Sequence, residues 1–262
     1  MKRPRLFVIL TTQRSGSGWL VDLLNDHPEI VTYGEMFRVT DTTIADYGAT
    51  TVPRFEVMVP TNTFSTSASL ASRRYDYVRG LARAHPEARA VGFKLMYDQT
   101  RDHPGLMGAL VLARASFVHL IRRDYLSALI SFDIAFDRDR WHYHEGDDVP
   151  RVRVHADPGE LLRRLDERDS EITQFRRRLS RLPVRVCELA YEDLREQRDD
   201  VLREVLQFLG VRPVRRPLRS PLVPTSPTSG LDALENRDDV VAALSGTRYA
   251  SMAGVPEQRV TP

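Results

Sequence analysis

The chain has 262 residues, and its 38 basic and 36 acidic side chains nearly cancel, which leaves a formal net charge of +2. This length can bury a substantial core in one α/β domain. The balanced charge, with no block of one sign, argues against a nucleic-acid-binding arm or a membrane-surface helix.

The single cysteine, Cys187, excludes an internal disulfide framework, and no Cys/His cluster has the spacing of a structural zinc site. The first ten residues carry too few apolar side chains for a signal segment or a membrane span. We therefore expect a cytoplasmic protein that binds no nucleic acid, inserts stably into no membrane and holds no metal ion. A homodimer is compatible with this composition.

Apolar runs alternate with helical periodicities along the chain. Residues 6–10 form the first run, which meets a Ser/Gly loop and then an amphipathic segment, so that a strand, a loop and a helix are predicted in this order. Continuous apolar runs over 90–95, 116–121 and 184–189 are typical of strands buried on both faces. Helical periodicity covers 66–84, 125–136, 158–181 and 198–209, and Gly210 is a plausible cap for the last of these helices. The alternation predicts a doubly wound α/β fold with a mostly parallel sheet.

Loops are predicted where this alternation fails. Residues 137–156 are polar and rich in His, Asp and Arg, and residues 212–229 contain prolines at 213, 217, 221, 224 and 227. The chain has no internal repeat, low-complexity tract or linker. We therefore predict a single domain over 1–262, with loop insertions at about 40–63 and 137–156 and a Pro-rich loop at about 212–229.

The loop after the first strand has the composition of an anion-binding site. Backbone N–H groups at the start of the following helix, together with the helix dipole, favour a bound phosphate-like group. Gly16 and Gly18 allow the backbone to approach a ligand closely, Ser15 and Ser17 add hydroxyl donors, and Arg14 adds a fixed positive charge. The alternative is a Ser/Gly turn that only caps the helix.

This loop resembles the 5′-phosphosulfate loop of the sulfotransferase family, which uses 3′-phosphoadenosine 5′-phosphosulfate (PAPS) as donor. The resemblance implies a P-loop-like three-layer fold with helices on both sides of a mostly parallel sheet. Trp19 stands where a nucleoside triphosphate loop needs lysine, which argues against a kinase. Gly18 departs from the family by removing one hydroxyl. The matching run, whose residues 14 to 19 are implied donor-binding residues, is Gln13-Arg14-Ser15-Gly16-Ser17-Gly18-Trp19-Leu20.

Two further segments resemble the family in the same chain order. Arg123 ends a predicted strand and Ser131 lies eight residues later (131 − 123 = 8), the spacing with which the family holds the 3′-phosphate of PAPS. A guanidinium and a hydroxyl suit a doubly charged anion. Arg122 is the competing register but would put Ile130 at the hydroxyl position. In the strand-to-turn segment at 184–194, the resemblance implies that Tyr191 borders the adenine.

Three residues are candidates for catalysis. Glu35, in Tyr33-Gly34-Glu35-Met36-Phe37, resembles the glutamate that is the general base of bacterial carbohydrate sulfotransferases; the alternative is an exposed turn glutamate. Lys94 is the only lysine besides Lys2 and lies in an apolar strand, so its ammonium should meet an anion: the sulfate, the acceptor site or a structural carboxylate. Arg14 is expected to stabilise the leaving phosphate oxygen.

The resemblance therefore implies a PAPS-dependent sulfotransferase. It would transfer a sulfuryl group to a hydroxyl of a sugar, a glycolipid or a natural product of bacterial secondary metabolism, and release 3′-phosphoadenosine 5′-phosphate (PAP) without a metal. A small-molecule kinase and a non-catalytic PAPS-binding protein are the alternatives. His103, His142 and His144 are interpreted as acceptor-loop or surface residues, and His119 as a core histidine.

Overall fold

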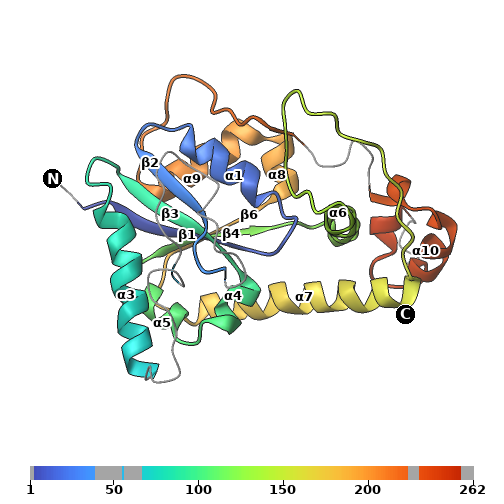
Figure 1. Ribbon diagram of the computed structural model, residues 1–262, viewed down its shortest axis with the longest axis horizontal. Coiled ribbons are helices and arrows are strands. Elements are labelled where there is room, and N and C mark those ends of the chain that lie inside the picture. The colour runs from blue at the N-terminus through green and yellow to red at the C-terminus, as the bar shows by residue number, and fades with distance from the viewer. Residues whose placement is uncertain (1–2, 39–54, 56–66, 224–229, 255–262) are drawn as a thin grey trace, which may run out of the picture. The chain divides into compact units, whose positions relative to one another are not determined.

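The computed structural model describes residues 3–38, 55, 67–223 and 230–254 (Figure 1). The chain divides into two compact units, Met1–Ile121 with Phe175–Ser220, and Arg122–Gln174 with Pro221–Pro262. Apart from Phe55, the insertion predicted at 40–63 lies outside the described residues. The single-domain interpretation stays a prediction.

A five-stranded parallel sheet forms the first unit, in the order β2-β3-β1-β4-β6. All five strands run in the same direction, so their carboxyl ends meet at one edge of the sheet, where α/β folds usually bind ligands. The strands are β1 (Arg5–Thr11), β2 (Ile30–Glu35), β3 (Ala90–Met96), β4 (Ser116–Ile121) and β6 (Val186–Ala190).

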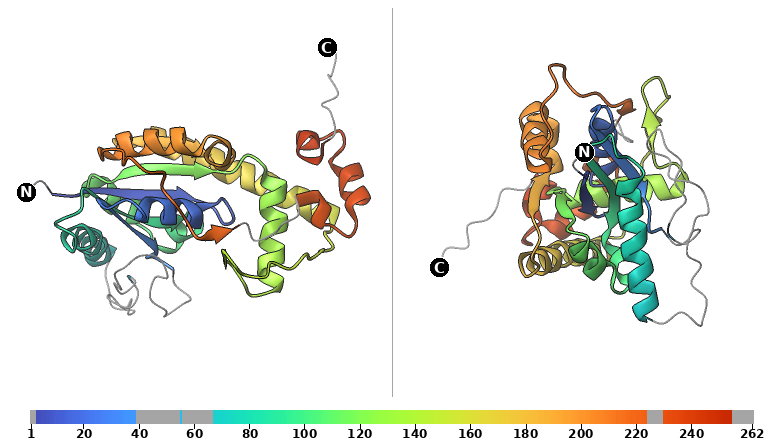
Figure 2. Two further views of the ribbon diagram at one scale, coloured as in Figure 1. Left: turned by 90° about the horizontal axis from the view of Figure 1, so that it is seen from above. Right: turned by 90° about the vertical axis from the view of Figure 1, so that its left-hand side faces the viewer.

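Helices cover both faces of this sheet, which gives the predicted three-layer arrangement (Figures 1 and 2). Leu20 and Leu24 of α1 pack with Leu206 of α9 against the sheet residues Phe7 and Val118, and all five side chains are buried. The helices of this unit are α1 (Ser17–Asn25), α3 (Ser67–Arg83), α4 (Tyr97–Asp102), α5 (Leu106–Leu112), α8 (Tyr191–Glu196) and α9 (Arg198–Leu209).

The second unit has an apolar core of its own. Leu129 of α6 packs there with Leu165 of α7 and with Val240 and Leu244 of α10. The last residues of α7, from Phe175 onward, belong to the first unit. The elements are α6 (Tyr125–Asp137), β5 (Tyr143–His144), α7 (Pro158–Ser180), β7 (Leu222–Val223), η1 (Gly230–Ala233), α10 (Arg237–Leu244) and η2 (Ala250–Ala253).

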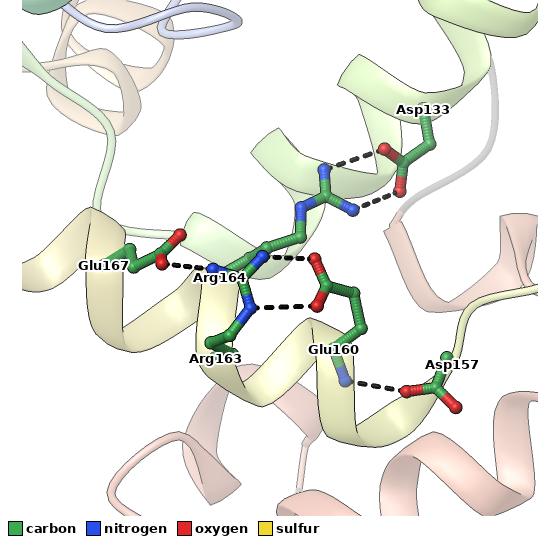
Figure 3. A network of polar contacts seen from close by, with 6 residues as sticks. All are labelled: Asp133, Asp157, Glu160, Arg163, Arg164 and Glu167. Atoms are coloured by element: carbon green, nitrogen blue, oxygen red, sulfur yellow. Dashed lines mark hydrogen bonds and ion pairs between the residues drawn. The ribbon is translucent and has the colours of Figure 1, made fainter.

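A bidentate ion pair joins α6 to α7 (Figure 3). Both terminal nitrogens of Arg164 donate to the carboxylate of Asp133, at 2.9 and 2.7 Å, and both side chains are partly buried. Asp157 accepts a hydrogen bond from the backbone N–H of Glu160 at the start of α7, which satisfies one of the free donors there. Because α6 also carries Ser131, this pair fixes the helix on which a candidate donor-binding residue lies.

Most predicted elements are confirmed, including the parallel sheet and the cap at Gly210, which adopts a left-handed φ of 71°. The prediction that the strand at 184–189 is buried on both faces is wrong. It begins at Val186, which is 39% exposed, because β6 is an edge strand with β4 as its only sheet neighbour. In the described part of the predicted loops, β5 and β7 form a two-residue antiparallel ladder.

No helix in the described ranges is long and apolar enough to span a membrane.

Gly92→Ala should destabilise the protein because a Cβ at Gly92 would lie 2.5 Å from the ring of Phe7, and the neighbouring strand residues are fully buried. Overpacking of this kind costs about 1–3 kcal/mol. Urea unfolding followed by circular dichroism measures the loss. The matched control is Gly108→Ala on α5, where a Cβ meets nothing within 4 Å; that variant should be as stable as the wild type or more stable. Equal stability of the two variants would contradict the packing argument.

Candidate functional site

The loop between β1 and α1 presents a row of free backbone donors. The N–H groups of residues 15–19 donate to no acceptor in the parts of the chain that the structure describes, and Leu20 is the first residue to bond back, to the carbonyl of Gly16. Arg14 and Gly16 adopt left-handed backbone conformations, with φ of 60° and 82°. Free donors of this kind, together with the helix dipole, suit a bound anion, as the sequence predicts.

Ser15 is built into the loop itself. Its residue is fully buried, and its Oγ lies 2.5 Å from Oγ1 of Thr11. Because Thr11 uses its own hydroxyl proton on the carbonyl of Leu120, at 2.7 Å, Ser15 must be the donor in that contact. In this arrangement the hydroxyl of Ser15 has no proton left for a ligand, while its backbone N–H remains available. Of the two groups of Ser15 that were predicted to bind the donor, only the backbone N–H therefore remains a candidate.

Tyr191 lies directly beside the loop, as the first residue of α8. A Cβ added to Gly16 would lie 2.3 Å from Cδ2 of Tyr191, so no larger residue fits at Gly16 while the ring keeps this position. Trp19 packs edge-on against the same ring, with centroids 6.2 Å apart. The structure thus brings together three of the predicted donor-binding residues.

Glu35 and Lys94 form an ion pair across β2 and β3. Nζ of Lys94 lies 3.0 Å from Oε1 of Glu35, and the side chains are 5% and 20% exposed, respectively. A register irregularity between Tyr33 and Glu35 aligns Glu35 with Lys94. The buried lysine therefore meets a carboxylate, which was one of its predicted partners, and that carboxylate belongs to the candidate base.

The ion pair keeps Glu35 ionised. Burial alone would raise the pKa of this carboxyl, but the charge and hydrogen bond of Lys94, with smaller contributions from Arg38 and Gln99, lower its pKa below the ordinary value. At neutral pH, Glu35 is an anion held between a cation and an amide. It can accept a proton, but only from a group that is becoming strongly acidic.

The short helix α4 connects this ion pair to the loop between β1 and α1, residues 12–16, called the anion loop below. The sequence patterns did not predict this helix. Gln99 donates from Nε2 to Oε2 of Glu35 at 2.7 Å, while its Oε1 accepts from the backbone N–H of Met96 at 3.2 Å. The preceding residue, Asp98, accepts from Nε2 of Gln13 in the loop at 2.8 Å. Two adjacent residues of one helix thereby hold the loop and the candidate base together. The available signal was a pair of polar residues directly after a buried strand.

A buried polar chain supports α4 from behind. The hydroxyl of Tyr97, the first residue of α4, lies 2.5 Å from Nε2 of His119 on β4, and Nδ1 of His119 lies 2.9 Å from Glu188 on β6. Arg176 of α7 donates to both carboxylate oxygens of Glu188. His119 is fully buried with both ring nitrogens bonded, which confirms it as a core histidine.

The candidate 3′-phosphate residues lie in the second unit. Arg123 is exposed and follows the end of β4 by two residues, and Ser131 lies on α6 and is partly buried. Asp124, the residue after Arg123, caps α6 by accepting from the backbone N–H of Ser127 at 2.9 Å, which fixes where the helix that carries Ser131 starts.

His103, interpreted above as an acceptor-loop or surface residue, lies in the turn between α4 and α5 but is not at the surface. It is 1% exposed at the end of α4, and its Nε2 lies 2.9 Å from the carbonyl oxygen of Phe37, because an aromatic cluster covers it. His144 is exposed, as predicted. Within the described ranges, no group of three or more His, Cys, Asp or Glu side chains could hold a metal ion.

Fold and site together define an α/β protein with free backbone donors in the loop after its first strand and a carboxylate–lysine pair at the same edge of the sheet. Residues 4–215 match the model of the Sulfotransferase family, so the chain belongs to this family and is a sulfotransferase.

Known proteins with similar sequences and structures agree with this assignment. The chain is 26% identical over 251 residues to Nodulation protein H of Rhizobium tropici, across 94% of this chain and 92% of that protein. It is 26% identical over 145 residues to Nodulation protein H of Rhizobium meliloti, across 55% and 53%. The solved sulfotransferase domain from the curacin biosynthetic pathway has the same fold, with a TM-score of 0.50, 17% identity and coverage of 87% of this chain and 82% of that one.

Glu188→Gln should destabilise the protein at neutral pH and not in acid. Hydrogen bonds from His119 and Arg176 lower the pKa of Glu188 from 4.5 to about 2. A lowered pKa in the folded state stabilises the fold above pH 4.5, and this contribution is lost as the pH falls towards about 2. With solvent screening of the half-exposed carboxylate, we expect a loss of roughly 1 kcal/mol at pH 7 in urea unfolding.

The control for this measurement is Glu196→Gln, which changes an exposed glutamate whose one ion-pair partner in the described ranges is exposed Arg195. Its stability should follow the wild type at every pH. A deficit of Glu188→Gln that stays the same at pH 7 and pH 3 would show that the carboxylate charge is not what stabilises the network.

Proposed function

We propose that this sulfotransferase moves the sulfuryl group of PAPS onto a hydroxyl of a small acceptor, a sugar, glycolipid or natural product, and releases PAP. The observation that carries the proposal is the free row of N–H groups at residues 15–19, which α4 ties to the Glu35–Lys94 pair through Gln13–Asp98 and Gln99–Glu35. An anion site and an ionised carboxylate are thereby held in one rigid arrangement.

The loop suits the 5′-phosphosulfate end of the donor. The backbone N–H groups of residues 15–19 would bind its oxygens, and Arg14 would neutralise the charge left on the 5′-phosphate oxygen when its bond to sulfur breaks. Tyr191, packed on Gly16, supplies an aromatic face next to this site for the adenine. Arg123 and Ser131 would hold the 3′-phosphate.

Glu35 acts as the general base in this proposal. The acceptor oxygen forms a new bond to sulfur while the bond from sulfur to the 5′-phosphate oxygen breaks, and the acceptor proton passes to Glu35. The lowered pKa of Glu35 fits this role, because a hydroxyl becomes strongly acidic only as its oxygen bonds to sulfur. A weak but fully ionised base is sufficient for such a late proton transfer.

Lys94 has two tasks in sequence. Before the donor binds, its ammonium keeps Glu35 ionised and oriented at 3.0 Å. During transfer it can share its donors with a sulfuryl oxygen, which raises the basicity of Glu35 when the proton must be accepted. One cation therefore serves both partners of the reaction.

PAP should bind far more tightly than ATP with magnesium in calorimetric titration of the purified chain, because the loop lacks the lysine of a triphosphate site.

Arg123→Ala should weaken PAP binding at least roughly tenfold, which is the effect of losing one charge-assisted contact. The same variant should weaken 5′-AMP binding much less, since AMP lacks the 3′-phosphate.

Arg122→Ala is the matched control, because it removes a neighbouring arginine of the competing register. It should affect PAP and 5′-AMP alike. The opposite pattern would assign the 3′-phosphate to Arg122, and tight binding of ATP with magnesium in place of PAP would favour a kinase.

Glu35→Gln should lower the rate of PAP formation from PAPS by roughly 10²–10⁴-fold, whereas binding of PAP stays near the wild-type value. Turnover is measured with a hydroxyl acceptor found by screening. Glu29→Gln, the same change at the exposed residue before β2, should keep full activity. Full activity of Glu35→Gln would remove Glu35 from the mechanism.

Lys94→Met tests the same assignment through pH. Without the ammonium, burial becomes the dominant influence and raises the pKa of Glu35, so the acid limb of the rate profile should move to higher pH than in the wild type. A variant with a lower rate but an unmoved acid limb would mean that Glu35 does not carry the titration.

A further inference from the structure

A basic cavity lies at the edge of the sheet opposite the candidate site. It has a volume of about 310 Å³, at the lower end of the range for small-molecule sites, and it lies where β1 and β4 begin. Four segments distant in sequence line it: the start of β1, α3, the α5–β4 turn and the residue before β6. The lining residues are Pro4, Arg5, Leu6, Arg79, Ala113, Arg114, Ser116 and Arg185.

Four of these eight residues are arginines and none is acidic. The positive charges of Arg5 and Arg185 are partly compensated, because both side chains contact the carboxyl-terminal end of α9, where the helix dipole is negative. Arg185 donates to the carbonyl of Phe208 at 2.9 Å, and the guanidinium of Arg5 lies against Gly210. The remaining two arginines have no such partner.

Arg79 and Arg114 form no side-chain hydrogen bond or ion pair with any residue in the described ranges. Nε of Arg79 is buried and lacks an acceptor, which is unfavourable for a charged donor. The hydroxyl of Ser116 likewise bonds no side chain or backbone group among those residues. The cavity thus gathers donors that have no acceptor among the described residues.

Arg114 occupies a position that favours another residue type. It follows α5 with a left-handed φ of 56°, where glycine is the usual choice. An arginine is retained there at a cost in backbone strain, and its side chain lines the cavity. Residues that break a local rule of this kind are concentrated at functional sites.

Many other arginines of this chain have a carboxylate within ion-pair distance. Arg89 pairs with Glu29, Arg176 with Glu188 and Arg248 with Asp166. A chain with a net charge of +2 has enough acidic residues for such pairing. Four like charges around one cavity without an acid repel one another unless an anion is bound between them.

We propose that this cavity binds a small polyvalent oxyanion, such as pyrophosphate or the phosphate or sulfate ester of a small molecule, at a site separate from the anion loop. Arg79, Arg114 and the hydroxyl of Ser116 bind its oxygens, while Arg5 and Arg185 contribute positive charge from the side of α9. The concave shape and limited volume favour a compact anion over an extended polyanion.

Calorimetric titration with sodium pyrophosphate at constant ionic strength tests the proposal. Wild-type protein should bind the anion, and Arg79→Gln and Arg114→Gln should each weaken this binding roughly tenfold or more. Arg114→Gln changes an exposed side chain, so it keeps the test valid if Arg79→Gln disturbs α3.

Arg73→Gln is the matched control, since it removes an exposed arginine of the same helix that does not line the cavity. It should bind pyrophosphate like the wild type. Arg14→Gln identifies any binding at the anion loop, which must respond to that change and not to Arg79→Gln.

Two results would overturn the proposal. One is pyrophosphate binding that Arg79→Gln and Arg114→Gln leave unchanged, or no binding at all. The other is an equal loss of pyrophosphate binding in Arg73→Gln and Arg114→Gln, which would indicate a diffuse basic surface. Binding of a single-stranded oligonucleotide that both variants weaken equally would lead to the same conclusion.

Discussion

The ion pair between Lys94 and Glu35 is the interaction on which the candidate site depends. A nearly buried ammonium is tolerated only with a close anion, and removal of one partner from a buried pair typically costs about 3–5 kcal/mol. The irregular register at the end of β2 brings Glu35 level with Lys94, and β3 then continues directly into α4. Strand pairing, charge pairing and the start of the helix therefore fix one another at the carboxyl edge of the sheet.

The hydrogen bonds of α4 extend this constraint in three directions. Gln99 donates to the candidate base Glu35, and Asp98 accepts from Gln13 in the anion loop. The hydroxyl of Tyr97 contacts His119, the first member of the buried row of polar side chains behind α4. A helix of six residues has little intrinsic stability, so these contacts hold it more than its own backbone bonds do. Support of this kind from behind is what keeps reacting groups within the small tolerances that group transfer requires.

Sequence patterns predicted the features that local chemistry determines. The strands are continuous apolar runs, the longer helices have clear periodicity, and the Ser/Gly loop after β1 carries its own signature. The same patterns could not identify α4, because its polar residues acquire their role from Glu35, which lies 64 residues earlier than Gln99. The patterns also could not predict that the hydroxyl of Ser15 would donate to Thr11, or that β6 would be an edge strand. Both features depend on which segments become neighbours in the fold.

The parallel sheet explains why candidate anion sites occur at both of its ends. Its carboxyl edge collects the loops that follow each strand, and its amino edge collects the residues that precede them, so Arg5 and Thr11 stand at opposite ends of the same strand. A ligand at the amino edge would stabilise the folded unit, and the stabilisation would grow with the logarithm of its concentration over its dissociation constant. A ligand at the amino edge could change the affinity of the anion loop for the donor only under a further condition. It would have to bind more tightly to one of two arrangements of the strands that connect the two sites. β1 and β4 are paired with neighbouring strands, and apart from Arg5 all their residues are buried, so the structure shows a single arrangement of these strands. We therefore expect an anion at the amino edge to act as a stabilising ligand and to leave donor affinity unchanged.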